Sequence, residues 1–436
     1  MADLKTFGAF TYKQNTRVGQ RNILPSEMRR RLIGDDEINN AKIRNAYRAY
    51  NAVVSTLLGD GDTDDIQVAI NTLNGTGEGG IILIRPGIYY PLTPLILYDN
   101  ITLMGVDPLS TIIDFDRAGN CTNGCIQIIG ENKTDDNTIT VTNGDATVTG
   151  ASTTFVDDGV SSGDIIIIWG ARYFVASVAS NTSLELTETY QGNTTSSLFY
   201  KIWSSKSNIN IYNLQIINGS LADTVGSGIK VIYADNIDIQ NNIITNHNTD
   251  GINVKTSFDV KIVNNNIKGS SDNGIYANQN VALLIDNNSV NNNTNNGIEC
   301  ASSIIEYNNF VNNNSCNANG LYGIQLNVSN NFTINNNFCG ANNSHGVYLN
   351  GSSYNTVVNN ICVGNGADGI HVTNQIGVNS EVNIVVGNTC KNNDDDGIEL
   401  TAGSSNNNVC HNIVLENLGT DTVDSGTGNT VADNSP

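Results

Sequence analysis

Short runs of alternating apolar and polar residues recur through residues 203–430, and turns rich in Asn, Gly and Ser separate them. Within a run the apolar residues take every second position, as at Ile229 and Val231, which indicates a strand buried on one face. The tetrapeptide x-Gly-Ile/Val-x marks one point of each repeat, and most of its glycines lie 23 residues apart. These glycines are Gly228, Gly251, Gly274, Gly297, Gly323, Gly346, Gly369 and Gly397.

A column of Asn residues follows the same period through these repeats. Short strands at a fixed period predict a parallel β-helix of about 23 residues per coil, in which each coil buries its inward row on its neighbours. We expect the Asn side chains to bond one another across the strand spacing of about 4.8 Å. The column is Asn242, Asn266, Asn288, Asn309, Asn337, Asn360, Asn388 and Asn412.

This ladder explains an unusual composition. Asn accounts for 72 residues, and 56 of them lie in residues 201–436, although Asn is depleted from ordinary strands and helices. Cys339, Cys362 and Cys390 each follow a ladder Asn by two places. We therefore expect them to stack as small buried apolar groups in one interior column.

The front of the chain predicts a different arrangement. Asp64 or Asp65 can cap a short helix whose apolar face is Ile66, Ala69, Ile70 and Leu73. The strand IILI, a Pro-Gly turn and further strands follow within residues 59–136.

Two further segments depart from the repeat. Residues 35–58 predict a helix capped by Asp35 or Asp36, with heptad spacing at Ile43, Tyr47, Tyr50, Val54 and Leu57. That helix could form an oligomer seam or cover the open end of the β-helix. Residues 137–202 predict short antiparallel strands with tight turns, as a small inserted β module. The module resembles β modules that recur in bacteriophage tail-fibre and tailspike proteins, which implies contact with glycan or virion; the alternative is a spacer.

Composition and charge exclude several classes of function. The formal net charge of −21 argues against nucleic-acid binding along the body. Residues 1–50 nevertheless hold ten Lys/Arg and five Asp/Glu, so a basic head precedes an acidic body. No apolar run reaches the roughly 18 residues of a membrane span, and the N-terminus lacks the apolar region of a signal peptide. The eight Cys show no paired zinc spacing; we expect no cofactor.

Three motifs near the front carry a family resemblance. The segment GDGDTDD, the turn PGIY at 86–89 and the strand NITLMG at 100–105 resemble the opening of the pectate-lyase-like right-handed β-helix superfamily. The resemblance covers residues 59–136 and 203–430. It implies an all-β, right-handed parallel β-helix, and it implies no single activity, because this fold hosts lyases, hydrolases, epimerases and binding spikes.

The basic head, the acidic body and the β-helix together resemble a bacteriophage tailspike or tail fibre. The resemblance implies a homotrimer on the virion tail, made in the host cytoplasm, that binds host surface polysaccharide. Its domains would be an attachment arm at 1–58 that docks on other tail proteins, the start of the β-helix at 59–136, the module at 137–202, the main coils at 203–430 and a tail at 431–436.

Motif matches to two enzyme families are poor. A pectate lyase needs an Arg base, and the last Arg of this chain is Arg172, inside the predicted module. The strings NTD at 248–250 and SHG at 344–346 resemble polygalacturonase motifs. They lie four coils apart, however, and no RIK motif follows.

The column before the corner glycines offers a better candidate site. His345, Asp368 and Asp396 are consecutive in it, about 4.8 Å apart. Two stacked carboxyls separate in pKa, and a neighbouring His can transfer a proton, which suits a retaining glycosidase. Asp before Gly is also an ordinary turn residue, and we expect the acidic run at 394–396 to be a solvated turn and no calcium site.

A second outward row lies two residues further on, and its polar and aromatic groups suit contact with sugar. This row is Glu299, Gln325, Tyr348, His371 and Glu399. Long intervals at Asn309–Gly323 and Gly369–Asn388 predict loops that build a site beside these coils.

Three functions remain open on sequence alone. The first is a tailspike that binds surface polysaccharide, with or without cleaving it. The second is a free polysaccharide hydrolase or lyase, and the third is a structural appendage without a ligand.

Overall fold

A computed structural model describes residues 50–435, except 57–60, 117–120, 122, 136, 219–225 and 302–308. Most of the predicted helix at 35–58 lies outside these residues, and only its residues 50–56 are described. Its described part is wrong, because Ala52–Val54 form strand β1, which pairs in parallel with β2. Val54 is fully buried there, so tertiary packing places it in the sheet and not on a helical seam.

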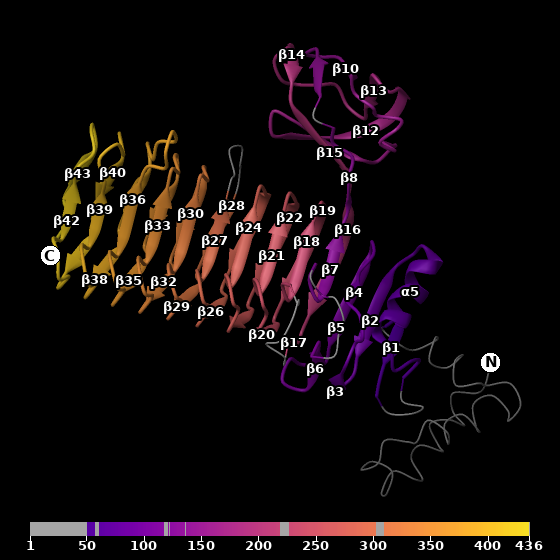
Figure 1. Cartoon of the computed structure of the whole chain (residues 1–436), viewed down its shortest axis with the longest axis horizontal. Coiled ribbons are helices and arrows are strands. Elements are labelled where there is room, and N and C mark those ends of the chain that lie inside the picture. The colour runs from indigo at the N-terminus through magenta and orange to yellow at the C-terminus, as the bar shows by residue number, and fades with distance from the viewer. Residues whose placement is uncertain are drawn as a thin grey trace, which may run out of the picture. The chain divides into compact units, whose positions relative to one another are not determined.

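The body is a parallel β-helix of three sheets, and each coil contributes one strand to each sheet (Figure 1). The first sheet has 13 described strands: β1, β2 (Gly80–Ile84), β5 (Ile101–Gly105), β16 (Lys206–Tyr212), β19 (Ala234–Gln240), β22 (Phe258–Val263), β25 (Val281–Asp286), β28 (Asn309–Asn312), β31 (Phe332–Asn335), β34 (Thr356–Val358), β37 (Ile384–Val386), β40 (Asn408–Cys410) and β43 (Thr430–Ala432).

The second and third sheets have 11 described strands each. The second comprises β3 (Gly87–Tyr89), β6 (Thr111–Asp114), β17 (Gln215–Ile217), β20 (Ile243–Thr245), β23 (Asn266–Lys268), β26 (Ser289–Asn291), β29 (Ser315–Asn317), β32 (Phe338–Gly340), β35 (Ile361–Val363), β38 (Thr389–Lys391) and β41 (Ile413–Leu415). The third comprises β4 (Leu95–Ile96), β7 (Ile126–Ile129), β18 (Ile229–Ile232), β21 (Ile252–Lys255), β24 (Ile275–Asn278), β27 (Ile298–Ala301), β30 (Ile324–Asn327), β33 (Val347–Asn350), β36 (Ile370–Thr373), β39 (Ile398–Leu400) and β42 (Thr422–Asp424).

The interior is one continuous column of Ile, Val, Leu and Cys side chains. The expected Cys stack is confirmed, because Cys339 pairs with Cys362 and Cys362 with Cys390 in successive strands. All eight Cys are free thiols. The corner glycines are required by space, since a Cβ on Gly346 would lie 2.7 Å from the carbonyl oxygen of Gly369.

The Asn ladder exists, and two of its predicted members are wrong. Asn265 and Asn314 hold the positions that we expected for Asn266 and Asn309. Each ladder Asn donates from Nδ2 to Oδ1 of the next coil's Asn, as Asn360 does to Asn388 at 3.0 Å. The backbone N–H of each Asn also donates to that same oxygen, which satisfies buried groups at every turn.

The ladder continues to the end of the chain. The residues expected to be a tail at 431–436 begin inside strand β43, and Asn434 accepts from Asn412 at 2.9 Å. The coil therefore extends at least to residue 435.

The predicted capping helix is confirmed as α5, Ile66–Thr76, with Asp65 as N-cap and the expected face buried. None of the helices in the described ranges is long and apolar enough to cross a membrane.

An antiparallel module interrupts the coils after β7 and occupies residues 131–204 (Figure 1). Its strands are β8 (Glu131–Asn132), β9 (Thr138–Val141), β10 (Thr147–Ala151), β11 (Ile165–Ile168), β12 (Ala171–Ser180), β13 (Ser183–Leu186), β14 (Thr195–Leu198) and β15 (Tyr200–Ser204). It packs on the coils through Trp203, whose ring stacks on Phe258 at 5.8 Å, and through an ion pair of 2.7 Å between Arg172 and Asp235.

Candidate functional site

The outward face of the third sheet carries the predicted row. Glu299, Gln325, Tyr348, His371 and Glu399 are direct partners in successive parallel strands, from β27 to β39. Five predicted side chains, far apart in sequence, therefore lie side by side on one surface.

The column of residues before the corner glycines also forms as expected. Its side chains accept backbone hydrogen bonds that stabilise the turns. The backbone N–H of one coil donates to the column side chain of the preceding coil. Asn273 donates to Asp250 Oδ1 at 3.3 Å, and Asn296 to Asn273 Oδ1 at 3.2 Å. The same contact joins Asp396 to Asp368 Oδ1 at 2.9 Å. An acceptor at this position holds the turn together.

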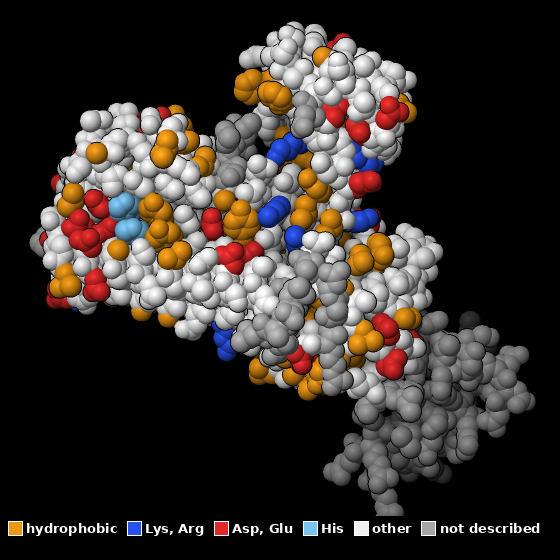
Figure 2. Space-filling model, viewed as in Figure 1, with side chains coloured by type: hydrophobic (Ala, Val, Ile, Leu, Met, Phe, Trp, Pro, Cys, Tyr) orange, Lys and Arg blue, Asp and Glu red, His pale blue; other side chains and the backbone are white. Residues whose placement is uncertain are grey.

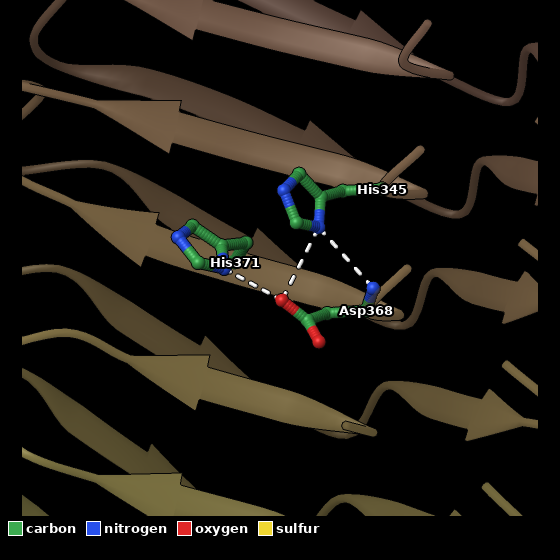
Figure 3. Close-up of side chains that lie close together, drawn as sticks. All are labelled: His345, Asp368 and His371. Carbon is green, nitrogen blue, oxygen red and sulfur yellow. Dashed lines mark hydrogen bonds and ion pairs between the residues drawn. The ribbon is translucent and has the colours of Figure 1, made fainter. Parts of the chain in front are cut away.

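Asp368 lies at the centre of the candidate site (Figure 3). It is 1% exposed. Its Oδ2 is 2.6 Å from Nδ1 of His371 and 3.2 Å from Nδ1 of His345. These contacts, with the Asp396 N–H on Oδ1, use both carboxylate oxygens. Burial alone would raise the pKa of Asp368, but the two imidazoles in contact with it hold that pKa far below its ordinary range.

The two histidines differ in the contacts of Nδ1. Nδ1 of His371 contacts only carboxylate oxygens, of Asp368 and, at 3.0 Å, of Glu399. A carboxylate only accepts, so this nitrogen carries a proton, and in a neutral ring Nε2 keeps a lone pair. Nδ1 of His345 lies 3.2 Å from both the backbone nitrogen and Oδ2 of Asp368. When it accepts the backbone N–H, the neutral ring carries its proton on Nε2. Burial lowers the pKa of His345 and favours this neutral form.

Both Nε2 atoms lie on the side of the rings away from Asp368 (Figure 3). The ring centroids are 4.3 Å apart and nearly parallel. In the described part of the chain neither Nε2 has a hydrogen-bond partner. When both rings are neutral, with the His371 proton on Nδ1 and the His345 proton on Nε2, the stacked pair presents a proton acceptor and a proton donor side by side.

Tyr322 and Tyr348 extend this stack. The Tyr322 ring is 5.5 Å from His345 and 4.5 Å from Tyr348, and the Tyr348 ring is 5.4 Å from His371. Burial raises the pKa of Tyr348 to about 12, so its hydroxyl stays protonated. Flat aromatic faces beside polar groups suit the apolar faces of sugar rings. Figure 2 shows this orange patch beside the pale-blue histidines and the red carboxylates.

Asp396 and Glu399 complete the acidic side of the site. One oxygen of each lies within 4.8 Å of an oxygen of Asp368. Burial raises the pKa of both. A second set of donor atoms, on His345, Asp368 and His371, lies within the same distance. Two imidazoles and a carboxylate are a donor set used for transition metals.

One of the two predicted loop insertions is wrong. Because Asn314 and not Asn309 is the ladder residue, the interval before Gly323 has ordinary length. The other is real: residues 374–383 follow β36, the strand of His371, and form a small turn bridged between Gln375 and Val378.

The sequence reasoning missed two functional features. It placed His345 and His371 in separate roles, whereas both contact one oxygen of Asp368. It also gave Tyr322 no role in the site. The string Asp-Gly-Ile-His at 368–371 could have predicted the contact between Asp368 and His371, because a corner turn brings the side chain of residue i+3 next to that of residue i.

Two family descriptions match parts of the chain. Residues 170–307 match "Right handed beta helix region", and residues 305–431 match "Periplasmic copper-binding protein (NosD)". The fold is therefore a right-handed parallel β-helix. No curated protein matches the chain in sequence.

Solved structures with a similar fold include enzymes and virion proteins. The mannuronan C-5 epimerase AlgE4 A-module of Azotobacter vinelandii is 14% identical, with a TM-score of 0.48 over 84% of this chain and 94% of that one. The tailspike protein gp49 from Pseudomonas phage LKA1 is 13% identical, with a TM-score of 0.48 over 91% and 76% of the two chains. ORF18 of Geobacillus virus E2 is 10% identical, with a TM-score of 0.47 over 84% and 57%. Nothing about function follows from likenesses this distant.

Proposed function

We propose that the outward face of the third sheet binds a polysaccharide and that His371 and His345 transfer protons on it. The observation that carries the proposal is a stack of two imidazoles whose Nδ1 atoms both contact Asp368, which leaves both Nε2 atoms without a hydrogen-bond partner in the described chain. In this scheme Nε2 of His371 takes a proton from the substrate and Nε2–H of His345 donates one to it. Fixed donor and acceptor positions of this kind are what general acid–base catalysis requires.

The proposal changes the role expected for Asp368. The sequence suggested that Asp368 and Asp396 act as a carboxyl pair. With both oxygens bonded and almost no exposure, Asp368 is better suited to orient His371 than to attack or protonate a sugar. We assign it a positioning role. Asp396 and Glu399 then set the electrostatics at the edge of the site.

Copper does not suit the cluster as it stands, although one matched family description names copper binding. Imidazole nitrogens and carboxylate oxygens bind transition metals at about 2.0–2.2 Å, so two donors on one ion lie roughly 3 Å apart. Nδ1 of His371 and Oδ2 of Asp368 are 2.6 Å apart, which is a direct hydrogen bond. We therefore expect activity to survive dialysis against a chelator.

The test is a degradation assay on a panel of bacterial surface polysaccharides. We would follow chain length, reducing ends and unsaturated uronate absorbance, which separate hydrolysis from elimination. His371→Ala should lower the rate by about 10²- to 10⁴-fold. His411→Ala is the matched control, because His411 is exposed and lies between β40 and β41, strands of the first and second sheets and not of the third. Full activity of the His371 variant, or binding without any change in the polymer, would refute the proposed chemistry.

We also propose that the protein is a homotrimeric tailspike component attached to a virion through residues 1–58. The basic charge of residues 1–50 supports a docking role for this segment, and the acidic remainder suits a body exposed to solvent. Light scattering should give three times 46.6 kDa. An antibody against the chain should label the tails of phage particles from a host that expresses it. A monomer absent from such particles would favour the free enzyme instead.

A further inference from the structure

Two lysines stand on the same outward face as the candidate site, near the inserted module. Lys230 lies on β18 and Lys255 ends the next strand, β21. Neither has a carboxylate within 4.0 Å among the described residues. Burial, and then the charge of Lys255, lower the pKa of Lys230, so the two ammonium groups are close enough to repel each other.

Two carboxylates on the coils of these lysines and the adjacent coil are already bonded to amides. Asp250 accepts from Asn253 at 2.6 Å and from Asn273 at 3.1 Å. Asp272 accepts from Asn295 at 2.6 Å. The positive charge of the lysine pair is therefore not cancelled by a direct ion pair, although the protein as a whole is acidic.

The module brings a third lysine to this place. Lys201 of β15 bonds the side chain of Gln279, which follows β24. On the preceding coil, Lys255 places its Nζ 5.3 Å from the ring centroid of Tyr276. Figure 2 shows blue side chains gathered where the coils meet the module, whereas red side chains gather beside the histidines at the other end of the view.

This basic patch is in line with the candidate catalytic residues. Lys230 pairs with Asn253, Asn253 with Tyr276, and Tyr276 with Glu299. The row then continues through Gln325 and Tyr348 to His371. His371 is six strand spacings from Lys230, or about 29 Å. An extended polymer lying along the row would reach both places at once.

We infer that Lys230 and Lys255, with Tyr276 as an aromatic platform, form a subsite for the anionic groups of an acidic polysaccharide, one whose sugars carry carboxylates. This inference rests on the proposed polysaccharide-binding function and names its substrate class. A carboxylate that bonds an ammonium group on a partly buried surface compensates for the hydration which that group has lost. A neutral polymer can offer a hydroxyl oxygen there but no opposite charge.

The experiment measures binding without turnover. Full-length His371→Ala would be titrated calorimetrically with polygalacturonate, polymannuronate and polyguluronate oligomers, and with the same oligomers after chemical reduction of their carboxyls. At least one acidic oligomer should bind at least tenfold more tightly than its reduced form, and more weakly as salt is raised. In that background, Lys230→Met and Lys255→Met should each weaken its binding about tenfold, the worth of one hydrogen bond to a charged group.

The matched control is Lys268→Met, an exposed lysine on β23 in the second sheet, which should leave binding unchanged. The inference is overturned if no acidic oligomer binds more tightly than its reduced form, or if the Lys230 and Lys255 variants bind like Lys268→Met. Circular dichroism excludes misfolding as the cause of a loss. The two proposals fail in different ways. Retained turnover by His371→Ala would refute the catalytic proposal, whereas the lysine substitutions in that background test only binding.

Discussion

Asp368→Asn tests the assigned role of Asp368 most sharply. In the variant the side-chain oxygen can still accept the backbone N–H of Asp396, now 2.9 Å away. The amide NH₂ would then face Nδ1 of His371, where a carboxylate oxygen now lies at 2.6 Å. An NH₂ group donates, so it favours a lone pair on Nδ1 and the ring proton on Nε2, and only the Glu399 carboxylate, 3.0 Å away, still holds the proton on Nδ1. We expect the proton to move to Nε2, so that the base is lost without removal of any ring.

The expected magnitudes follow from these contacts. Loss of a general base lowers the rate by about 10²- to 10⁴-fold. Loss of one hydrogen bond to a charged group costs roughly 2 kcal/mol of unfolding free energy at pH 7. The pKa of Asp368 is lowered in the folded state, so its carboxylate contributes stability above the unfolded value near 3.9. That contribution disappears as the pH falls through the folded pKa, where wild type and variant should converge.

Asp250→Asn is the matched control for stability. Asp250 holds the same column position and accepts the same kind of backbone bond, but no histidine contacts it. Burial raises its pKa, so its carboxylate costs stability at pH 7 and the substitution should be neutral or stabilising. Urea unfolding at several pH values and the degradation assay give both readouts. Asp368→Asn with more than a tenth of wild-type activity, or with the same sign of stability change as Asp250→Asn, would refute this reasoning.

Three further predictions concern the stack, a buried histidine and the ladder. Tyr348→Ala should lower activity at least tenfold, whereas Tyr348→Phe should keep most of it, because the ring and not the hydroxyl contacts both imidazoles; equal losses would contradict this. Burial lowers the pKa of His247 to about 4, so wild type should lose up to about 3 kcal/mol of stability as the pH falls from 6.5 to 4. In urea unfolding, His247→Asn should show no such loss. Asn265→Ala should destabilise the fold by roughly 3 kcal/mol in the same measurement, because it removes three hydrogen bonds to buried groups of the two neighbouring coils. Its exposed neighbour gives the comparison: Asn266→Ala should change stability by less than about 0.5 kcal/mol, and similar losses would refute the observed register.

Repetition made the coils predictable from sequence. A glycine recurring at one period, with Ile or Val after it, fixes both the coil length and the buried face, as at Gly346 and Val347. The same repetition hid single-residue errors. Asn264, Asn265 and Asn266 are consecutive, and composition cannot say which of three amides enters the ladder. Successive residues of a strand point to opposite faces. The prediction of Asn266 in place of Asn265 therefore assigned an exposed side chain to the buried ladder.

The row and column of the candidate site were predictable for the same reason, because parallel pairing fixes which residues are neighbours. The hydrogen bonds among these side chains were not predictable. Whether Asp368 pairs with Asp396, His345 or His371 depends on rotamers at the corner, and the repeat pattern contains no rotamers. The antiparallel module was recognisable as an interruption, but its docking through Trp203 and Phe258 joins residues of two unrelated patterns, which no period connects.

The scaffold itself indicates where function lies. The turn before each corner glycine needs an acceptor, and Asp250, Asn273 and Asn296 supply it in successive coils. An Asn or Asp at this position therefore needs no functional explanation. Tyr322 breaks the rule, because the His345 N–H makes no such bond to it in the described structure. His345 does supply an acceptor, because its ring nitrogen Nδ1 accepts the backbone N–H of Asp368. Tyr322 thus gives up the turn bond and His345 keeps it only through its ring, while both side chains stack with Tyr348 and His371. In an Asn-rich β-helix, departure from the amide rule is thus a stronger sign of a site than any match to a short Asn, Asp and Gly motif.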